Sequence, residues 1–122
     1  MPDTKVEGSG DCGNSPKNKL AQDIAVGLET GGLSAELLAD DVVWQRADGK
    51  EIEGAEAVLA ALDRVKAPKL VKVDHAISHG KVGAANGIST GRDGKARGFA
   101  HVIGFTSTSA KKVAVIRSYE AG

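Results

Sequence analysis

The fold is decided by residues 69–120, which read KLVKVDHAISHGKVGAANGISTGRDGKARGFAHVIGFTSTSAKKVAVIRSYE. Turn-forming residues interrupt this stretch at three places: Gly80-Lys81, Arg92-Asp93-Gly94 and Ser109-Ala110-Lys111. The segments between these turns therefore read as four long antiparallel strands joined by tight hairpins. The expected strands run from Lys69 to His79, Val82 to Thr90, Ala96 to Thr108 and Val113 to Glu120.

Glycines inside these strands suggest that the sheet is strongly curved. They lie at Gly83, Gly87, Gly98 and Gly104. A glycine inside a strand often marks a bulge or a bend, where the sheet can curl instead of lying flat.

Two helices are expected before the four strands. The first begins at Asn14 or Ser15 and runs to about Glu29, with an apolar stripe at Leu20, Ile24 and Leu28. The second covers 55–65 and ends before a proline at position 68. A short strand containing Val42 and Trp44, with a brief return through Ile52, separates them. Residues 1–13 are polar and glycine-rich, so we expect a disordered tail followed by one domain over 14–122.

Composition limits the classes of partner. The chain has 122 residues, enough for one compact domain, and its 16 basic and 16 acidic side chains balance. Without net positive charge, nucleic acid and anionic membranes are poor candidate partners. The single cysteine, Cys12, permits no intramolecular disulfide, and the first residues lack the pattern of a signal peptide. We therefore expect a cytoplasmic protein.

The order of elements and four segments resemble the SnoaL-like branch of the nuclear transport factor 2-like superfamily. The segments are LLADDVVWQRADGKEIEGAEAVLAAL, DHAISHGKVGAANGISTGRDGK, GFAHVIGF and VIRSYE. This resemblance implies an α+β fold in which a strongly curved, mostly antiparallel sheet wraps around N-terminal helices as a cone. It also implies a homodimer formed through the outer face of the sheet. The isomerases and cyclases of the superfamily place an acidic residue, or an acid paired with histidine, in the cone. In this sequence we expect no acidic residue in phase with the inward apolar positions.

Several polar side chains share a strand face with apolar residues and are candidates for a cavity. His75 alternates in phase with Val71 and Val73, and Asn86 is in phase with Val82 and Ile88. A buried donor or acceptor without a partner is unfavourable by ~1 to 3 kcal/mol, so such groups require either a core partner or a ligand. Both alternatives stay open for these residues.

The remaining candidates lie on the last strands and on the short strand that contains Trp44. His101 lies between Phe99 and Phe105 in phase, and an imidazole in this position could act as an acid or a base. Trp44 could stack on a flat ligand or anchor the sheet to the first helix. We thus predict His101 and His75 as catalytic candidates, and Trp44, Asn86, Phe99 and Phe105 as ligand-binding candidates.

No cofactor or metal site is expected from the sequence. His75 and His79 would be ~13 Å apart on a strand, too far to share one zinc ion. The segment GKVGAANG precedes no helix and so forms no phosphate-binding loop.

Three functions remain open from the sequence. The first is a protein that binds a small apolar molecule in the cone cavity. The second is an isomerase, cyclase or dehydratase that uses His101 or His75 as a general base, with Asn86 or the Trp44 indole stabilising an oxyanion. The third is a dimeric interaction domain that uses the outer face of the sheet.

Overall fold

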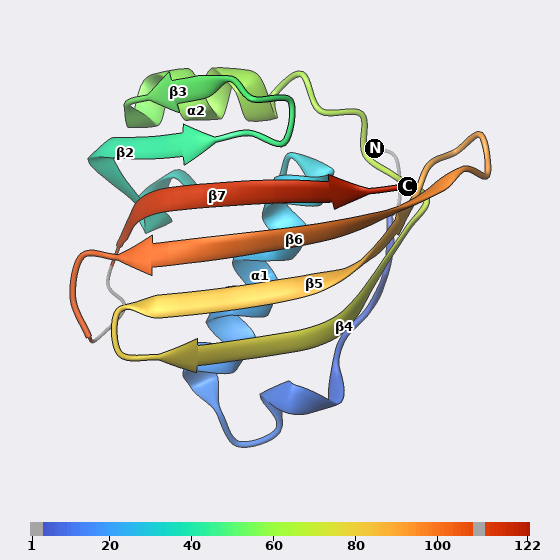
Figure 1. The fold of residues 1–122 in the computed structure, drawn as a ribbon, viewed down its shortest axis with the longest axis horizontal. Helices are drawn as coiled ribbons and strands as arrows, with labels where there is room; N and C mark the ends of the chain where they lie inside the picture. Colours follow the sequence, from blue (N-terminus) through green and yellow to red (C-terminus); the bar gives the residue numbers. More distant parts are fainter. Residues whose placement is uncertain (1–3, 109–111) are drawn as a thin grey trace.

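The computed structural model describes residues 4–108 and 112–122. Within these ranges the chain forms two α-helices and seven strands (Figure 1). The helices are α1 (Pro16–Thr30) and α2 (Ala55–Leu62). The strands are β1 (Lys5–Glu7), β2 (Leu38–Gln45), β3 (Glu51–Glu53), β4 (Leu70–His79), β5 (Val82–Thr90), β6 (Ala96–Phe105) and β7 (Val113–Ala121). The turn expected at Ser109-Ala110-Lys111 lies outside the described residues.

All seven strands belong to one sheet, in the order β1-β4-β5-β6-β7-β2-β3. Strands β4 to β7 form the expected antiparallel meander, whereas β2 joins β7 in parallel and β1 joins β4 in parallel. Helix α1 lies across one face of the sheet, and α2 lies beside β2 and β3 (Figure 1). The predicted fold class is confirmed: an α+β chain with a curved, mostly antiparallel sheet that does not close. Both helices in the described residues are too short or too polar to span a lipid bilayer.

Local sequence signals explain where α1 begins and ends. The Ser15 hydroxyl accepts a hydrogen bond from the Asn18 amide at 3.2 Å, and Pro16 occupies the first turn. Gly31 ends the helix in the left-handed conformation, with φ of 82°, and its amide donates to the Gly27 carbonyl. The side chain at Glu29, in the last turn, is buried.

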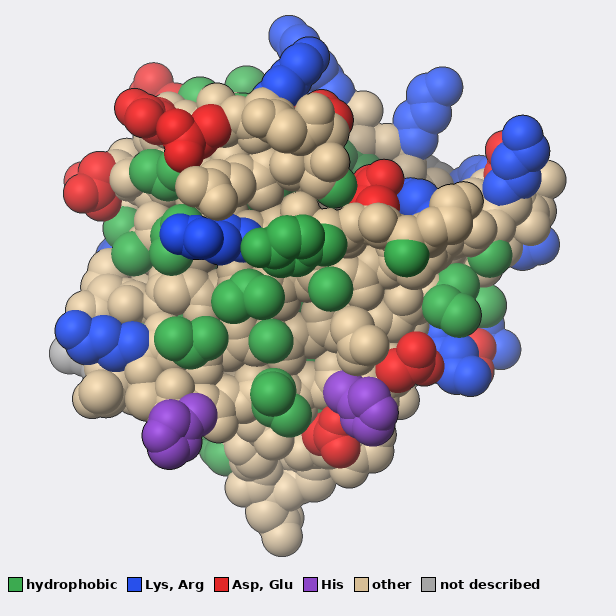
Figure 2. Space-filling view, in the orientation of Figure 1, with side chains coloured by type: hydrophobic (Ala, Val, Ile, Leu, Met, Phe, Trp, Pro, Cys, Tyr) green, Lys and Arg blue, Asp and Glu red, His purple; other side chains and the backbone are tan. Residues whose placement is uncertain are grey.

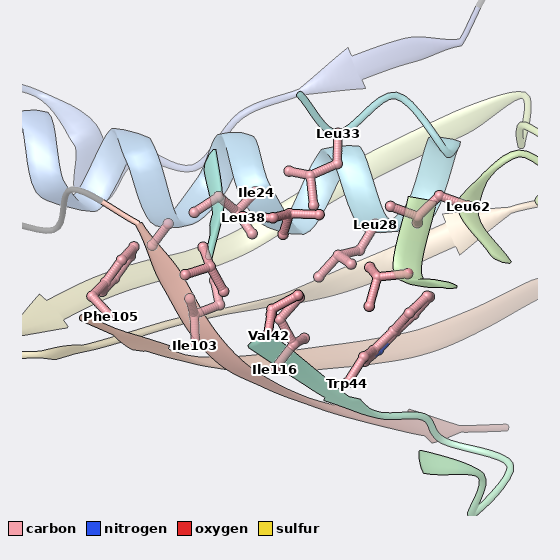
Figure 3. Close-up of a cluster of buried hydrophobic side chains, with 13 residues drawn as sticks. Ile24, Leu28, Leu33, Leu38, Val42, Trp44, Leu62, Ile103, Phe105 and Ile116 are labelled. Carbon is pink, nitrogen blue, oxygen red and sulfur yellow. The ribbon is translucent and has the colours of Figure 1, made fainter. Parts of the chain in front are cut away.

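The main core runs along α1 from Phe105 at one end to Trp44 at the other (Figure 3). Its buried residues are Ala21, Ile24, Leu28, Leu33, Leu38, Val42, Trp44, Val58, Leu62, Ile103, Phe105, Val113 and Ile116. A second buried cluster contains Ala25, Val71, Val73, Ala76, Ala85 and Phe99. Burial of these side chains supplies the main driving force for folding and holds α1 on the concave face of the sheet.

A β-bulge in β4 reverses the expected phase of its second half. The pairing of β4 with β5 shifts between Val73 and His75. Val73 is buried before the shift, and Ala76 is buried after it. The prediction that His75 faces inward is therefore wrong: the extra residue turns its side chain outward, where it is 73% exposed.

The prediction that Asn86 faces the cavity is also wrong. Asn86 does share a face with Val82 and Ile88, as the sequence indicates, but this face is the outer one. Val82 is 50% exposed there. The inner positions of β5 hold small residues, including Gly83. The larger apolar residues alternate on the outer face, so their pattern predicted the wrong face as the buried one.

The N-terminal segment differs from the expected disordered tail. Residues 4–13 contain β1 and a turn of 3₁₀ helix at Gly10–Cys12. The Asp11 carboxylate accepts from the Ala76 amide and pairs with His75, each at 3.1 Å. Backbone pairing and polar contacts hold this segment, and a composition argument based on apolar residues does not detect them. Residues 1–3 lie outside the described residues.

Candidate functional site

Five polar or aromatic side chains from four elements meet on the concave face of the sheet. Glu29 comes from the last turn of α1, Trp44 from β2, Arg97 and His101 from β6, and Ser118 from β7. His101 and Ser118 are directly opposite each other in the antiparallel pairing of β6 and β7. This register brings their Cβ atoms close together, and the last turn of α1 places Glu29 against His101.

The side chains form a continuous hydrogen-bonded chain. The Trp44 indole donates to Ser118 Oγ at 2.9 Å, and Ser118 Oγ lies 2.7 Å from His101 Nδ1. His101 Nε2 lies 2.7 Å from Glu29 Oε2. Glu29, His101 and Ser118 are all less than a tenth exposed, so these hydrogen bonds are buried. We call the series Trp44, Ser118, His101 and Glu29 the polar chain. Buried groups of this kind are stable only because each has a partner.

The charge of Glu29 fixes the direction of the hydrogen bonds. Burial alone would raise the pKa of Glu29, but the hydrogen bond with His101, the charges of His101 and Arg97 and a hydrogen bond with Ser89 together lower it below the ordinary value. An ionised carboxylate only accepts, so His101 Nε2 carries the proton and donates it. In the neutral imidazole Nδ1 then accepts from the Ser118 hydroxyl.

Arg97 holds the second oxygen of the Glu29 carboxylate. Its Nη2 donates to Glu29 Oε1 at 2.9 Å. Its Nη1 lies 3.0 Å from Glu120 Oε1 as an ion pair, yet the geometry is not that of a hydrogen bond. Arg97 Nη1 is buried and is thus left without a hydrogen-bond acceptor among the described residues. Such a donor can bind an acceptor that enters from outside the chain.

A pocket of about 710 Å³ opens beside this polar chain. Its inner wall includes Glu29, Trp44, Arg97, His101 and Ser118. Residues of three loop segments form its rim: 46–48 after β2, 65–68 before β4, and 91–93 with 95 between β5 and β6. The volume falls in the range of small-molecule sites.

Aromatic contacts fix two of the wall residues. The Phe99 ring stacks on His101, with centroids 5.4 Å apart and planes at 29°. The Arg46 guanidinium lies 5.2 Å from the Trp44 ring centroid, so it covers part of that ring. The imidazole and the indole therefore have little freedom to move.

The structure brings together only some of the predicted site residues. His101 and Trp44 both line the pocket. Phe99 is buried against His101, and Phe105 lies at the far end of the core (Figure 3). His75 and Asn86 are on the outer face, where they oppose each other between β4 and β5. A joint role for His101 and Asn86 at one ligand is excluded by this separation onto two faces.

The sequence analysis missed Glu29, and the expectation of no inward acidic residue is wrong. Glu29 lies four residues after Ala25 and eight after Ala21, both fully buried. The same helical spacing places its side chain on the inward face of α1. The alanines indicate a buried helix face less clearly than the leucines beside them. A carboxylate at the end of a helix is also expected to be exposed to solvent.

Phase could also have found two further residues, Ser118 and Arg97, but not a third, Ser89. Ser118 alternates in phase with the buried Ile116 on β7, and Arg97 alternates in phase with Phe99 and His101 on β6. Ser89 follows two small inward residues on β5, so its phase carried little signal. In the part of the chain that the structure describes, no three His, Cys, Asp or Glu side chains gather closely enough to hold a metal ion.

Comparison with protein-family models gave no match, and neither did comparison with curated protein sequences. Solved structures do match. An NTF2-like protein of unknown function from Burkholderia xenovorans has a TM-score of 0.68 at 15% identity, over 86% of this chain and 83% of that one. A proposed ketosteroid isomerase from Kribbella flavida has a TM-score of 0.62 at 17% identity, over 72% and 63%. A proposed SnoaL-like polyketide cyclase from Shewanella putrefaciens has a TM-score of 0.63 at 11% identity, over 87% and 90%.

Identities this low carry information about architecture and none about chemistry. The resemblance that the sequence analysis drew from four segments is confirmed at that level. The chain has the fold of the nuclear transport factor 2-like proteins.

Proposed function

We propose that the protein binds a small, partly apolar organic molecule in the pocket between α1 and the inner face of the sheet. The observation that carries this proposal is a hollow of about 710 Å³ whose wall contains a buried, ordered polar chain. A few convergent polar groups in a partly apolar cavity are typical of ligand sites. The neighbours named as an isomerase and a cyclase support the same use of the fold.

The wall suggests what kind of molecule fits. Leu28, Trp44, Val65 and Pro68 offer apolar surface. Arg97 Nη1, which is ion-paired with Glu120, makes no hydrogen bond and can donate one to a ligand. Lysines at positions 66 and 95 stand at the rim. These features suit a flat molecule with a carbonyl or another oxygen acceptor at its inner end.

Binding can be tested with a variant that closes the pocket. Ala67 lines the pocket, so Ala67→Trp adds an indole there while Glu29, His101 and Ser118 stay unmutated. The exposed Ala57 on α2 takes the matched control Ala57→Trp. Native mass spectrometry with flat aromatic ketones should show a one-to-one complex for the wild type and Ala57→Trp. Ala67→Trp should bind at least about tenfold more weakly, equivalent to ~1.4 kcal/mol.

Equal occupancy in Ala67→Trp and Ala57→Trp would show that the ketones bind elsewhere. If none of a broad series of such ketones bound the wild type, the ligand class proposed here would be wrong.

A second candidate is an enzyme of isomerase, cyclase or dehydratase type. The observation that favours it is the buried pair of Glu29 and His101, since a carboxylate that orients an imidazole is common in acid–base catalysis. Each ketone that binds should be followed by NMR for conversion. Conversion by the wild type that is lost in His101→Ala, with binding retained, would support the enzyme; unchanged conversion in His101→Ala would contradict it.

The outer face of the sheet supports a third property, assembly into a homodimer. Exposed apolar side chains gather on this face, as the space-filling view shows (Figure 2). They include Ile77, Val82, Ile88 and Tyr119. Contiguous exposed apolar surface is unfavourable in water and marks interfaces. Sedimentation velocity at micromolar concentration should show a dimer that Ile77→Lys shifts toward monomer; a wild-type monomer would refute this assembly.

We place the protein in the cytoplasm. The supporting observation is a single cysteine, Cys12, which forms no intramolecular disulfide. Fractionation of the cells that produce the protein should find it with the soluble intracellular fraction, and recovery from the medium would contradict this placement.

A further inference from the structure

We infer that Ser118 is a nucleophile activated by His101 and Glu29, so that the pocket cleaves small carboxylic esters. This inference rests on the proposed binding of a small molecule in the pocket, and it names the chemistry that the polar chain performs there. Serine, imidazole and carboxylate stand in one hydrogen-bonded series, with 2.7 Å at each of the two links. A nucleophile in contact with a base that a third group orients is the general signature of covalent catalysis.

The positions of the protons along the polar chain suit a nucleophilic role for Ser118. Glu29 is held as a carboxylate by Arg97, so it accepts the Nε2 proton of His101. In the neutral form of His101, Nδ1 is then the basic nitrogen, and it faces Ser118 Oγ. Both imidazole nitrogens already have hydrogen-bond partners, Ser118 and Glu29. His101 can therefore accept a proton from the Ser118 hydroxyl but not directly from a ligand.

Trp44 strengthens the alignment of the hydroxyl. An indole nitrogen can only donate, so its 2.9 Å contact uses one lone pair of Ser118 Oγ. The serine hydrogen is thereby directed to His101 Nδ1, which is the orientation needed for proton transfer. The other lone pair of Oγ is left for a bond to carbon.

The pocket supplies the remaining requirements. Ser118, His101 and Glu29 all line it, so the nucleophile and its base open on the same hollow. Arg97 also lines it, and its buried Nη1 is ion-paired with Glu120 but makes no hydrogen bond. A preorganised donor of this kind can stabilise the negative oxygen of a tetrahedral intermediate.

The reaction balances with water as the only co-reactant. Ser118 Oγ forms a bond to the ester carbonyl carbon while its proton passes to His101 Nδ1. The bond from that carbon to the alkoxy oxygen then breaks, and the proton on Nδ1 goes to the departing alcohol. Water attacks the acyl carbon and gives a proton to Nδ1. The bond to Ser118 then breaks, the serine recovers the proton, and a carboxylic acid leaves.

A fluorophosphonate ester tests this inference without a known substrate. Ser118 Oγ would form a bond to phosphorus, fluoride would leave, and the serine proton would pass through His101 to solvent. We expect one adduct per chain by intact mass, located on Ser118 by peptide mapping. Because the map is made on the wild-type protein, it does not depend on whether any variant folds.

Variants separate a catalytic from a structural role. Ser118→Ala should abolish the adduct and lower hydrolysis of p-nitrophenyl acetate at least ~100-fold, whereas Ser34→Ala, at an exposed site before the Ala35–Leu37 turn, should match the wild type. Glu29→Gln should slow labelling while the adduct still maps to Ser118.

An unlabelled wild type, or an adduct on another residue, would overturn the inference. If aromatic ketones still bound the wild type in a manner sensitive to Ala67→Trp, only the nucleophilic role would fail. Loss of that binding pattern would instead refute the proposed function itself.

Discussion

Glu29 is the residue on which the electrostatics of the site depend. Its carboxylate receives hydrogen bonds from His101 and Arg97 inside the protein and so keeps its charge away from water. A buried charge is tolerated only with such partners, because the partners replace the lost hydration. Removing the charge should therefore affect both the stability and its dependence on pH.

Glu29→Gln should lower the free energy of unfolding at pH 7 by about 1 to 3 kcal/mol, because Arg97 and His101 lose a charged partner. The folded-state pKa of Glu29 lies below its ordinary value of 4.5. A lowered pKa means that the contribution of the carboxylate is complete above ~4.5 and is lost as pH falls through the folded-state value. The difference in free energy of unfolding between wild type and Glu29→Gln should thus become smaller at acidic pH. Urea denaturation at a series of pH values measures this difference.

The exposed Glu36 gives a control for this measurement. Glu36→Gln should stay within ~0.5 kcal/mol of the wild type at each pH, as expected for a surface substitution. If the difference in free energy of unfolding between wild type and Glu29→Gln increased below pH 4.5, the lowered pKa of Glu29 would be contradicted.

Strands β4 and β5 show why the alternation of apolar residues along a strand can fail to predict which face of the sheet a residue occupies. The bulge after Val73 inserts one residue, and from there the inner and outer faces of β4 exchange. Gly87 pairs with Val73 beside this bulge. A Cβ at Gly87 would overlap the Lys72 carbonyl oxygen, so the bulge requires glycine at this position.

Gly87→Ala should therefore destabilise the protein by about 2 kcal/mol or more, since backbone cannot move aside as a flexible side chain can. Gly98 offers a matched control, because a Cβ there would make ordinary contacts of 3.5 Å with Ala121. Urea denaturation of both variants makes the comparison. Equal losses in Gly87→Ala and Gly98→Ala would argue against the close approach at the bulge.

The elements themselves could largely be predicted from sequence, whereas the faces of two strands could not. Strand β5 has the expected bounds, Val82–Thr90, because turn residues mark both ends. The glycines suggested bulges, but which strand carries the extra residue depends on pairing that a single sequence does not reveal. His75 was misplaced for this reason, and Asn86 was misplaced because the inner positions of β5 hold only small residues. His101, in the regularly paired part of β6, was correctly placed among the inward residues.

At the scale of the whole molecule, the curved sheet separates two surfaces with different uses. The concave side holds α1, the core and the pocket, and the convex side presents exposed apolar side chains (Figures 1 and 2). The polar chain joins α1, β2, β6 and β7, which are distant in sequence, so only the folded arrangement makes Glu29 and Ser118 members of one site. This explains why residue patterns alone led to His101 and Trp44 but not to their partners.

The three histidines of the chain allow the most direct test of the central claim, that a small molecule binds against the buried polar chain. His101 lines the pocket, whereas His75 and His79 are exposed outside it. In a nitrogen-15 NMR titration with a bound aromatic ketone, the imidazole signals of His101 should shift to saturation while those of His75 and His79 stay unchanged. Shifts confined to His75 or His79, or an unperturbed His101 at saturating ketone, would contradict the account.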